Sequence, residues 1–456
     1  MKTYDHIILG SGQATGTLLG KLIPSGDRIA VIEADSVGGS CVNFGCTPTK
    51  TLVASARAIH QARCGDHYGF KVGNVQPDYA RIRERMNEIR NGSRKSLVEW
   101  MTSSENVDLI RGWGKFTGPR SIRVGEEEYS GKHIYINTGT RAAIPDIPGI
   151  DTVTALDSAG LLELTSLPEH LVIIGGGYIG IEFAQIYRRF GASVTILQRD
   201  DQLMPEEDEE VGRTIREILE AEGVRVLLEA DTRKIDKVGD QIRFQIEKGD
   251  GRITLEGTHL LVATGRRPNS TDLELETAGI QTDEKDYIKV DDYCRTNVEN
   301  VYAVGDVNGR GAFTHTSVND AEIVLDLLNG GNRKISDRIP IYALFSDPPL
   351  GRVGLSEKAA RQAGRKFLKS TKPMQEISRA KEMGATRGFA KLLVDPESSL
   401  IIGATVFGPG GDEIINMFAA IMYSQIPCYE YRKVVLVHPT VSELMPWMLD
   451  GLEKVE

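Results

Sequence analysis

The feature that most constrains the fold is a pattern of strand, Gly-rich turn, helix and strand that occurs twice along the chain. The first copy has an apolar strand at residues 4–9, the turn Gly10-Ser11-Gly12, a helical stretch and a second strand at residues 28–32. The second copy, at residues 171–197, repeats this order, and its turn contains Gly175, Gly177 and Gly180. Each copy predicts a βαβ unit whose turn holds a pyrophosphate at a helix N-terminus. We therefore expect an α/β fold with two dinucleotide-binding domains.

The length of 456 residues fits about three domains. The two βαβ units place Rossmann-like domains at residues 1–150 and 151–267. From about residue 339 no further Gly-rich phosphate turn occurs, and strands mix with amphipathic helices. We therefore expect a separate α+β domain at residues 339–456 and a segment at residues 268–338 that returns to complete the first domain.

Charge and cysteine content exclude several classes of protein. The chain has 54 basic and 64 acidic side chains, a net charge of −10, which disfavours nucleic acid or an anionic membrane as partner. Its apolar runs are strand-sized, and the N-terminus lacks a signal-peptide core. Five cysteines are too few for a secreted disulfide framework. We expect a soluble, cytoplasmic protein in which any paired cysteines carry chemistry.

The residue that follows the second strand of each unit distinguishes the two ligands. Glu33 lies 21 residues after Gly12, and Gln198 lies 21 residues after Gly177. An acid at this place hydrogen-bonds a ribose 2′-hydroxyl, so the first unit is expected to bind FAD or NAD. Gln198 removes a charge that would repel a 2′-phosphate, and Arg199 could bind one. The second unit is therefore predicted to prefer NADPH, with NADH as the other coenzyme and a solvated arginine as the alternative interpretation.

The first turn departs from the dinucleotide fingerprint because Thr15 occupies the place of the third glycine. That glycine allows close packing of helix on strand, and a threonine adds bulk there. We expect a weaker match in the first unit than in the second, with the neighbouring Gly16 relieving part of the crowding.

A pair of cysteines, Cys41 and Cys46, follows the first unit within a few residues. Thr47-Pro48 is typical of an N-cap and first helical residue, which predicts a helix to about residue 63. The helix N-terminus and Lys50 would lower a thiol pKa and favour the thiolate that attacks disulfides. We expect a redox-active dithiol; the alternatives are an inert buried pair or a structural zinc site, the latter disfavoured because the other cysteines are scattered singles: Cys64, Cys294 and Cys428.

Five motifs then resemble the class I pyridine nucleotide-disulfide oxidoreductases, the family of dihydrolipoamide dehydrogenase, glutathione reductase and mercuric reductase. In chain order they lie at residues 39–50, 175–182, 263–269, 302–306 and 438–443. The resemblance covers nearly the whole chain. It implies a C-terminal dimerisation domain and a homodimer with active sites shared across the interface.

The resemblance also implies FAD on the first unit, with Glu33 at the adenosine ribose, Gly114 near the adenine and Asp306 at the ribityl and phosphate portion. Asp306 follows a strand and a glycine, where doubly wound sheets bind ligands, although a simple Gly-Asp turn is the alternative. Further residues expected at the cofactor sites are Gly10, Gly12, Gly39, Ser40, Lys50, Thr138, Gly139, Gly175, Gly177, Gly180 and Gly265.

Four catalytic roles are implied in the same way. Lys50 and Glu182 resemble the family's ion pair near the reactive edge of the flavin, where a buried charge needs its partner. His438, oriented by Glu443 and contributed by the partner subunit, would be the catalytic base. Hydride would pass from NADPH through FAD to the Cys41–Cys46 disulfide and on to a disulfide-type substrate.

The sequence leaves the substrate open. Cys-Val-Asn, Gln198-Arg199 and Phe313-Thr314-His315 are similar to mercuric reductase, but that enzyme's C-terminal cysteine pair is missing from this sequence. Reduction of Hg(II) or Cu(II) is therefore kept as an alternative, and no resident metal site is predicted. A flavin-bound redox sensor without turnover is a second alternative.

Overall fold

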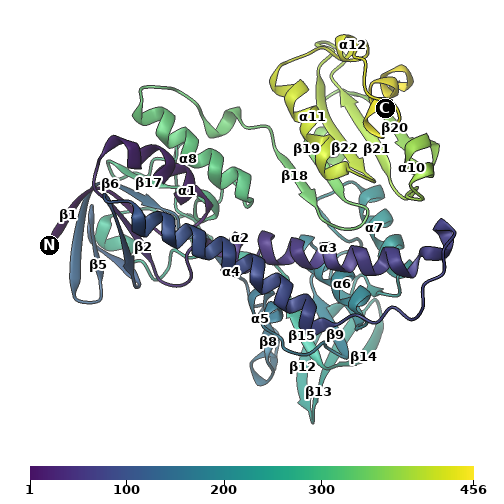
Figure 1. Cartoon of the computed structure of the whole chain (residues 1–456), viewed down its shortest axis with the longest axis horizontal. Coiled ribbons are helices and arrows are strands. Elements are labelled where there is room, and N and C mark those ends of the chain that lie inside the picture. The colour runs from purple at the N-terminus through teal and green to yellow at the C-terminus, as the bar shows by residue number, and fades with distance from the viewer. Residues whose placement is uncertain (456) are drawn as a thin grey trace.

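Three main sheets organise the chain, and each forms the centre of its own lobe (Figure 1). The computed structural model describes residues 1–455. Two long helices, α3 (Cys46–Arg63) and α4 (Tyr79–Ser103), run between the lobes, with the short α2 (Gly39–Asn43) before them. These connecting helices bring the cysteine pair to the middle of the molecule.

The first sheet has the order β3-β2-β1-β6-β5-β4, and β17 pairs with β6. Its parallel strands are buried on both faces, so Ile7 and Ile8 are both fully buried. Helices α1 (Gln13–Leu22) and α8 (Thr314–Leu328) share a core with one face. The strands are β1 (Lys2–Leu9), β2 (Ile29–Glu33), β3 (Val107–Arg111), β4 (Gly114–Gly118), β5 (Ser121–Val124), β6 (Glu127–Ile136) and β17 (Val301–Ala303).

The second sheet is parallel, with the order β11-β10-β9-β15-β8. Helix α6 (Tyr178–Phe190) follows β9 and contributes to a core with α7 (Glu209–Ala221). The strands are β8 (Ala155–Leu156), β9 (His170–Ile174), β10 (Ser193–Leu197), β11 (Arg225–Leu227) and β15 (His259–Val262). An antiparallel sheet beside it contains β12 (Asp231–Val238), β13 (Gln241–Lys248) and β14 (Gly251–Gly257).

The third sheet is antiparallel, with the order β18-β19-β22-β21-β20-β23, and α11 (Gly411–Tyr423) packs on it. Its strands are β18 (Ile341–Leu344), β19 (Leu350–Gly354), β20 (Leu368–Pro373), β21 (Phe389–Val394), β22 (Ile401–Phe407) and β23 (Glu453–Lys454). Val435 and Val437 of this lobe are 94% and 76% exposed. An exposed apolar patch of this kind is typical of a protein interface.

The remaining α-helices and β-strands are short. They are α5 (Ser158–Leu162), α9 (Glu357–Gln362), α10 (Ser378–Glu382), α12 (Cys428–Tyr431) and the antiparallel pair β7 (Thr140–Ala142) and β16 (Arg266–Pro268). Over residues 1–455, no helix combines the length and the apolar character needed to cross a membrane.

The start of α3 differs from the prediction. The helix begins at Cys46 with Gly45 as its N-cap residue, so Thr47 lies inside the first turn and caps nothing. Without a side-chain cap, the first amides of α3 are left for the cysteines and for ligands.

Candidate functional site

The first Gly-rich turn and the cysteine segment are in direct contact. A side chain at Gly10, whose φ is +98°, would place its Cβ 2.3 Å from the carbonyl oxygen of Asn137. A side chain at Gly39, at the start of α2, would place its Cβ 2.7 Å from the Cα of Gly12. Only glycine permits this approach, which seats the redox motif on the turn.

Glu33 is held beside the same turn, as the sequence predicts. Its Oε2 accepts hydrogen bonds from the backbone N–H of Ser11 at 2.9 Å and from the Ser11 hydroxyl at 2.5 Å. Gly114 starts β4 at the same sheet edge, where an added Cβ would lie 2.6 Å from Leu9. These residues surround the place where the adenosine half of a dinucleotide is expected.

Thr15, at the place of the third glycine, is held in the first turn by two hydrogen bonds. Its hydroxyl donates to the carbonyl oxygen of Gly10 at 2.9 Å and accepts from Nδ2 of Asn137 at 2.9 Å. In the second turn, a side chain at Gly180 would strike the carbonyl oxygen of Gly175 at 2.2 Å. In both turns the residue at the third position of the fingerprint packs against the carbonyl oxygen of the first glycine. In the first turn Thr15 makes this contact by a hydrogen bond, and in the second turn Gly180 makes it by having no side chain.

Asp306 lies in a 3₁₀ helix (Gly305–Asn308) directly after β17, at the carboxyl end of the first sheet. Thr140 donates a hydrogen bond to its Oδ2 at 3.0 Å. Burial raises the pKa of this carboxyl group, and the Thr140 hydrogen bond opposes the rise. Thr138 and Gly139 precede Thr140 and are fixed by hydrogen bonds to Asn269. A half-buried carboxylate with free acceptor positions fits a ligand that brings hydroxyl groups.

A pocket of about 470 Å³ opens over the first turn. One wall comes from the turn and α1, and the other comes from α4 through Ser93, Ser96, Leu97 and Trp100. The sequence prediction missed this wall, because no pattern in a charged amphipathic helix announces a ligand. The pocket and the glycine contacts fit an FAD pyrophosphate at this place.

The two cysteines form an asymmetric dithiol. Cys41 lies in α2, with the exposed Ser40 beside it, and Cys46 is the first residue of α3. A hydrogen bond from Cys41 lowers the pKa of Cys46 to about 6, and Thr314 and the charge of Lys50 also favour its thiolate. The same hydrogen bond and burial raise the pKa of Cys41. The negative charge of the reduced pair therefore resides on Cys46.

Lys50 and Glu182 form the predicted ion pair. Nζ of Lys50 donates to Oε2 of Glu182 at 2.6 Å, and the Glu182 side chain is 7% exposed. The bond joins α3, which begins at a redox cysteine, to α6, which begins at the second Gly-rich turn. Two motifs 132 residues apart thus meet at one place.

The second turn is held in the same way as the first. Oε1 of Gln198 accepts from the N–H of Gly176 at 2.8 Å, while its Nε2 donates to Asp200. Arg199 is exposed and has no hydrogen bond or ion pair with any residue of the part that the structure describes. No protein atom lies within 4 Å of a Cβ built at Gly177 or Gly265. The space over this turn is therefore open to a ligand.

His438 and Glu443 pair with each other but not with the cysteines. Nδ1 of His438 lies 3.0 Å from both carboxylate oxygens of Glu443, and the imidazole is 78% exposed. Within residues 1–455, no hydrogen bond or ion pair links His438 to Cys41 or Cys46. The pair is oriented but lies apart from the dithiol of its own chain.

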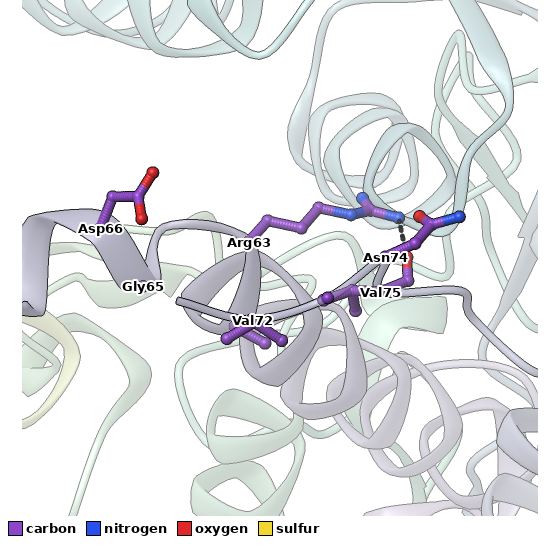
Figure 2. A pocket seen from close by; sticks show the side chains of 8 residues that line it. Arg63, Gly65, Asp66, Val72, Asn74 and Val75 are labelled. Carbon is purple, nitrogen blue, oxygen red and sulfur yellow. Dashed lines mark hydrogen bonds between the residues drawn. The ribbon is translucent and has the colours of Figure 1, made fainter. Parts of the chain in front are cut away.

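Two further features lie outside the predicted site. A pocket of about 290 Å³ after α3 is lined by Arg63, Asp66, Asn74 and neighbouring residues, and none of the predicted site residues lines it (Figure 2). Among the described residues, no group of three or more His, Cys, Asp or Glu side chains is arranged to hold a metal ion.

Comparison with known proteins gives consistent matches. The family described as pyridine nucleotide-disulphide oxidoreductase matches residues 4–321, and its dimerisation domain matches residues 341–449. The chain is 37% identical over 452 residues to the probable pyridine nucleotide-disulfide oxidoreductase RclA of Escherichia coli (strain K12). That alignment covers 97% of this chain and 98% of RclA. It is 31% identical over 417 residues to a mercuric reductase of Lysinibacillus sphaericus, covering 90% and 76%.

A dihydrolipoyl dehydrogenase of Chlamydia pneumoniae is 30% identical over 449 residues, covering 97% of this chain and 95% of its own. Among solved structures, the Cu(II) complex of the HOCl-induced flavoprotein disulfide reductase RclA from Escherichia coli matches with a TM-score of 0.90 and 36% identity. That match covers 99% of this chain and 100% of the other. The expected α/β fold, with two nucleotide-binding units and a C-terminal α+β lobe, is confirmed.

Proposed function

Because the chain belongs to the class I pyridine nucleotide-disulfide oxidoreductase family, whose members use FAD and NAD(P)H, we propose that it reduces a disulfide substrate with electrons from NADPH. One observation carries this proposal. The Cys41–Cys46 pair sits on the first Gly-rich turn, and the helix that starts at Cys46 bonds through Lys50 to Glu182 on the helix of the second turn.

The residues of the first unit would hold FAD. Glu33 and Asp306 offer carboxylate oxygens to the ribose and ribityl hydroxyls, and the glycines of the turn admit the pyrophosphate. When bound, FAD supplies the transfer of two electrons from the nicotinamide to the cysteine disulfide. Lys50, fixed by Glu182, would keep a positive charge beside the thiolate of Cys46.

The second unit supports NADPH as the coenzyme. The side-chain oxygen of Gln198 accepts a hydrogen bond from the backbone N–H of Gly176, as that of Glu33 does from Ser11, but Gln198 carries no charge. An unpaired Arg199 beside it offers a charge-assisted hydrogen bond to a 2′-phosphate. NADH lacks this phosphate and would gain nothing from the arginine.

The chemical steps follow from the asymmetry of the dithiol. The Cys41 sulfur attacks one sulfur of the substrate disulfide, forms a mixed disulfide and releases the first thiol. The thiolate of Cys46 then attacks the Cys41 sulfur, which re-forms the Cys41–Cys46 disulfide and releases the second thiol. One NADPH and one proton are consumed for each substrate disulfide reduced to two thiols.

Cys41 needs a base, because its raised pKa leaves its proton in place. We assign this role to the partner subunit's His438, which would take the proton of Cys41 and give it to the leaving thiolate. Glu443 accepts from Nδ1 and thereby leaves Nε2 to face the sulfur. The matched dimerisation domain supports a homodimer, and within residues 1–455 the exposed His438 makes no hydrogen bond or ion pair with Cys41 or Cys46.

We also propose the domain division 1–150, 151–267, 268–338 and 339–456. Strand β17 supports the third of these segments, because it joins the first sheet beside β6 after the chain has formed the second sheet.

The test is an anaerobic reaction of the holoenzyme with NADPH and a panel of disulfides, in which thiols are counted against NADPH oxidised. We expect two thiols per NADPH for at least one disulfide, and loss of this activity in Cys46→Ser. Cys64→Ser, at the other end of α3, serves as the control and retains activity. NADPH oxidation that no disulfide stimulates would overturn the proposal.

A second candidate, reduction of a metal ion at the same cysteines, is favoured by two similarities. The solved relative is described as a Cu(II) complex, and the similar proteins include mercuric reductases. When Cu(II) or Hg(II) replaces the disulfide in the same anaerobic assay, this candidate predicts NADPH oxidation that depends on the metal ion. Reduction of the dithiol by NADPH without turnover on any acceptor would indicate a redox sensor.

A further inference from the structure

On each of the helices α3 and α6, one face carries residues of the proposed site in the first turns and an arginine two turns further along. On α3, Cys46, Lys50 and Arg57 are separated by four and seven residues, a spacing that keeps them on one side of the helix. On α6, Glu182 and Arg189 are also separated by seven residues. Seven residues are two turns, or about 10 Å along the axis, so the segment after β18 can attach to each helix at two points. A further bond, from Nη1 of Arg63 to the carbonyl oxygen of Arg189 at 2.6 Å, joins α3 to α6 directly at the far end of α3.

The first attachment point is the Lys50–Glu182 bond, and it includes the segment after β18. The backbone N–H of Phe345 donates to Oε1 of Glu182 at 3.0 Å. Nζ of Lys50 lies 4.6 Å from the centre of the Phe345 ring, a cation–π contact. The third lobe thus contributes to the pair that the proposed function places at the flavin.

The second attachment point is Asp347, two residues further along this segment. Oδ2 accepts from Nη1 of Arg189 at 2.7 Å, and Oδ1 lies 3.2 Å from Nε of Arg57. Its backbone N–H donates to Oε1 of Gln185 at 2.8 Å, and its carbonyl oxygen accepts from Nε2 of the same glutamine. Asp347 therefore touches both helices, with Gln185 lying between the two points on α6.

We propose that Asp347 is a positioning residue that holds α3 in register with α6, so that Lys50 reaches Glu182 and Cys46 together. A slip of one residue along a helix is about 1.5 Å, enough to break a 2.6 Å hydrogen bond. The Arg63 bond lies 13 residues, or about 20 Å along α3, from Lys50, whereas the Asp347 contacts lie about 10 Å from it. Asp347 therefore fixes the part of α3 nearer to Lys50. This inference rests on the proposed function only in taking Cys46 as the thiolate that Lys50 serves.

The alternative is that Asp347 merely neutralises Arg189, which is 4% exposed. Glu222, at the end of α7, also neutralises Arg189, because its carboxylate accepts two hydrogen bonds from the Arg189 guanidinium at 2.7 Å. A variant of Glu222 therefore tests the effect of neutralisation alone. Among the described residues, Glu222 makes no hydrogen bond or ion pair with α3 or with residues 345–347, although it shares Arg189 and Gln185 with Asp347 and its charge acts on His60 of α3. Glu222→Gln is therefore the matched control for Asp347→Asn.

The experiment titrates the Cys46 thiolate by its ultraviolet absorbance in the reduced holoenzyme, in a Cys41→Ser background and against Cys41→Ser/Cys46→Ser. We expect Asp347→Asn to raise the midpoint by about half to one pH unit, because Lys50 moves away from the sulfur. Glu222→Gln should lower the melting temperature at least as much and leave the midpoint in place. Within the chain, the groups that face the Cys46 sulfur besides Lys50 are Cys41, replaced in all samples, and Thr314, unchanged in all. In the proposed homodimer the partner's His438 also faces the dithiol, and it too is the same in all samples.

A double variant completes the test. If Asp347 acts by bridging to α3, adding Arg57→Gln to Asp347→Asn should shift the midpoint little further. An unchanged midpoint in Asp347→Asn, or an equal shift in Glu222→Gln, overturns the proposal. Because this titration uses no NADPH and no substrate, its outcome is independent of whether a disulfide proves to be the acceptor.

Discussion

The hydroxyl oxygen of Thr314 lies 3.4 Å from the sulfur of Cys46, although 268 residues separate them in the sequence. Thr314 is the first residue of α8, whose N-terminus therefore points toward the dithiol. The same hydroxyl is also a hydrogen-bond partner of Cys41, where it favours the thiolate. One side chain thus contacts both sulfurs, and a helix start with its positive dipole end lies behind it.

Replacing Thr314 by valine should raise the pKa of Cys46. Valine keeps the shape of the threonine side chain but has no hydroxyl, so the thiolate loses a hydrogen-bond donor. Since a lowered pKa means that the thiolate persists down to about pH 6 and is lost below it, the loss in Thr314→Val should begin at higher pH. We expect a displacement of about one pH unit in the thiolate titration. Thr314→Ser keeps the hydroxyl and should titrate like the parent; if Ser and Val variants coincide, the hydrogen bond has no role.

Replacing Glu182 by glutamine should slow the reduction of the dithiol by NADPH. Lys50 would lose the partner that fixes it at 2.6 Å, and a partly buried cation without its partner reorients toward water. We expect a decrease of at least about tenfold, equivalent to roughly 1.4 kcal/mol, in a stopped-flow measurement. Glu163→Gln, which removes the partner of Arg90 on α4, is the control and should leave the rate unchanged.

Replacing Arg199 by alanine should raise the KM for NADPH about tenfold or more and leave the KM for NADH unaltered. The arginine is exposed and unpaired in the described chain, so its removal leaves no protein group without a partner. Steady-state kinetics with both coenzymes measure the effect. Arg213→Ala, on the exposed side of α7, is the control. Equal changes for both coenzymes would remove Arg199 from 2′-phosphate recognition.

Replacing Asp306 by asparagine should weaken FAD binding and stabilise the FAD-free chain. A charged hydrogen bond to a ligand hydroxyl contributes about 1.5–3 kcal/mol, so we expect roughly ten- to hundredfold weaker binding by fluorescence titration. Burial raises the pKa of Asp306, so folding favours its protonated form.

The sign of the stability effect follows from that shift. The carboxylate destabilises the FAD-free fold above the raised pKa, and the penalty disappears below the pKa of the unfolded chain. Asp306→Asn should therefore melt at a higher temperature than the parent at neutral pH but not in acid. Asp291→Asn, in the same return segment and paired with Arg295, is the control for FAD affinity. A variant that binds FAD as tightly as the parent would contradict the assignment.

The sequence predicted local elements better than the contacts between them. Both βαβ units, Glu33 beside its turn and the Lys50–Glu182 pair were expected and are found. The start of α3 was missed because Thr47-Pro48 resembles a cap, while Gly45, without a side-chain bond, begins the helix through backbone geometry. Local patterns decide where a strand or helix forms, since they depend on neighbours in the chain.

Thr314 and Asp347 show why the rest could not be predicted. Thr314 begins α8 and Asp347 lies in the loop between β18 and β19, both in segments far from the cysteines along the chain. Each reaches its partners only after the lobes have packed. Phe313-Thr314-His315 is similar to mercuric reductase in sequence, but that similarity does not say that the Thr314 hydroxyl contacts Cys46. An Asp-Pro turn is a common sequence with no required ligand. The hydroxyl of Thr15 is a similar case, because the fingerprint records a glycine and cannot record a substitute hydrogen bond.

The shared active site can be tested with mixed dimers. His438→Ala should leave NADPH-driven reduction of the dithiol intact and slow disulfide turnover by about a hundredfold or more, because proton transfer by a positioned base contributes that much. Cys41→Ser should be inactive for a different reason, since the attacking sulfur is gone. If His438 serves the partner's cysteines, a dimer of one His438→Ala chain and one Cys41→Ser chain contains one complete site. We therefore expect up to half the parent's turnover in purified mixed dimers with two different affinity tags. If each active site were built from one chain alone, both chains of the mixed dimer would carry a defect. The mixed dimer would then show only the low activity of the His438→Ala and Cys41→Ser homodimers.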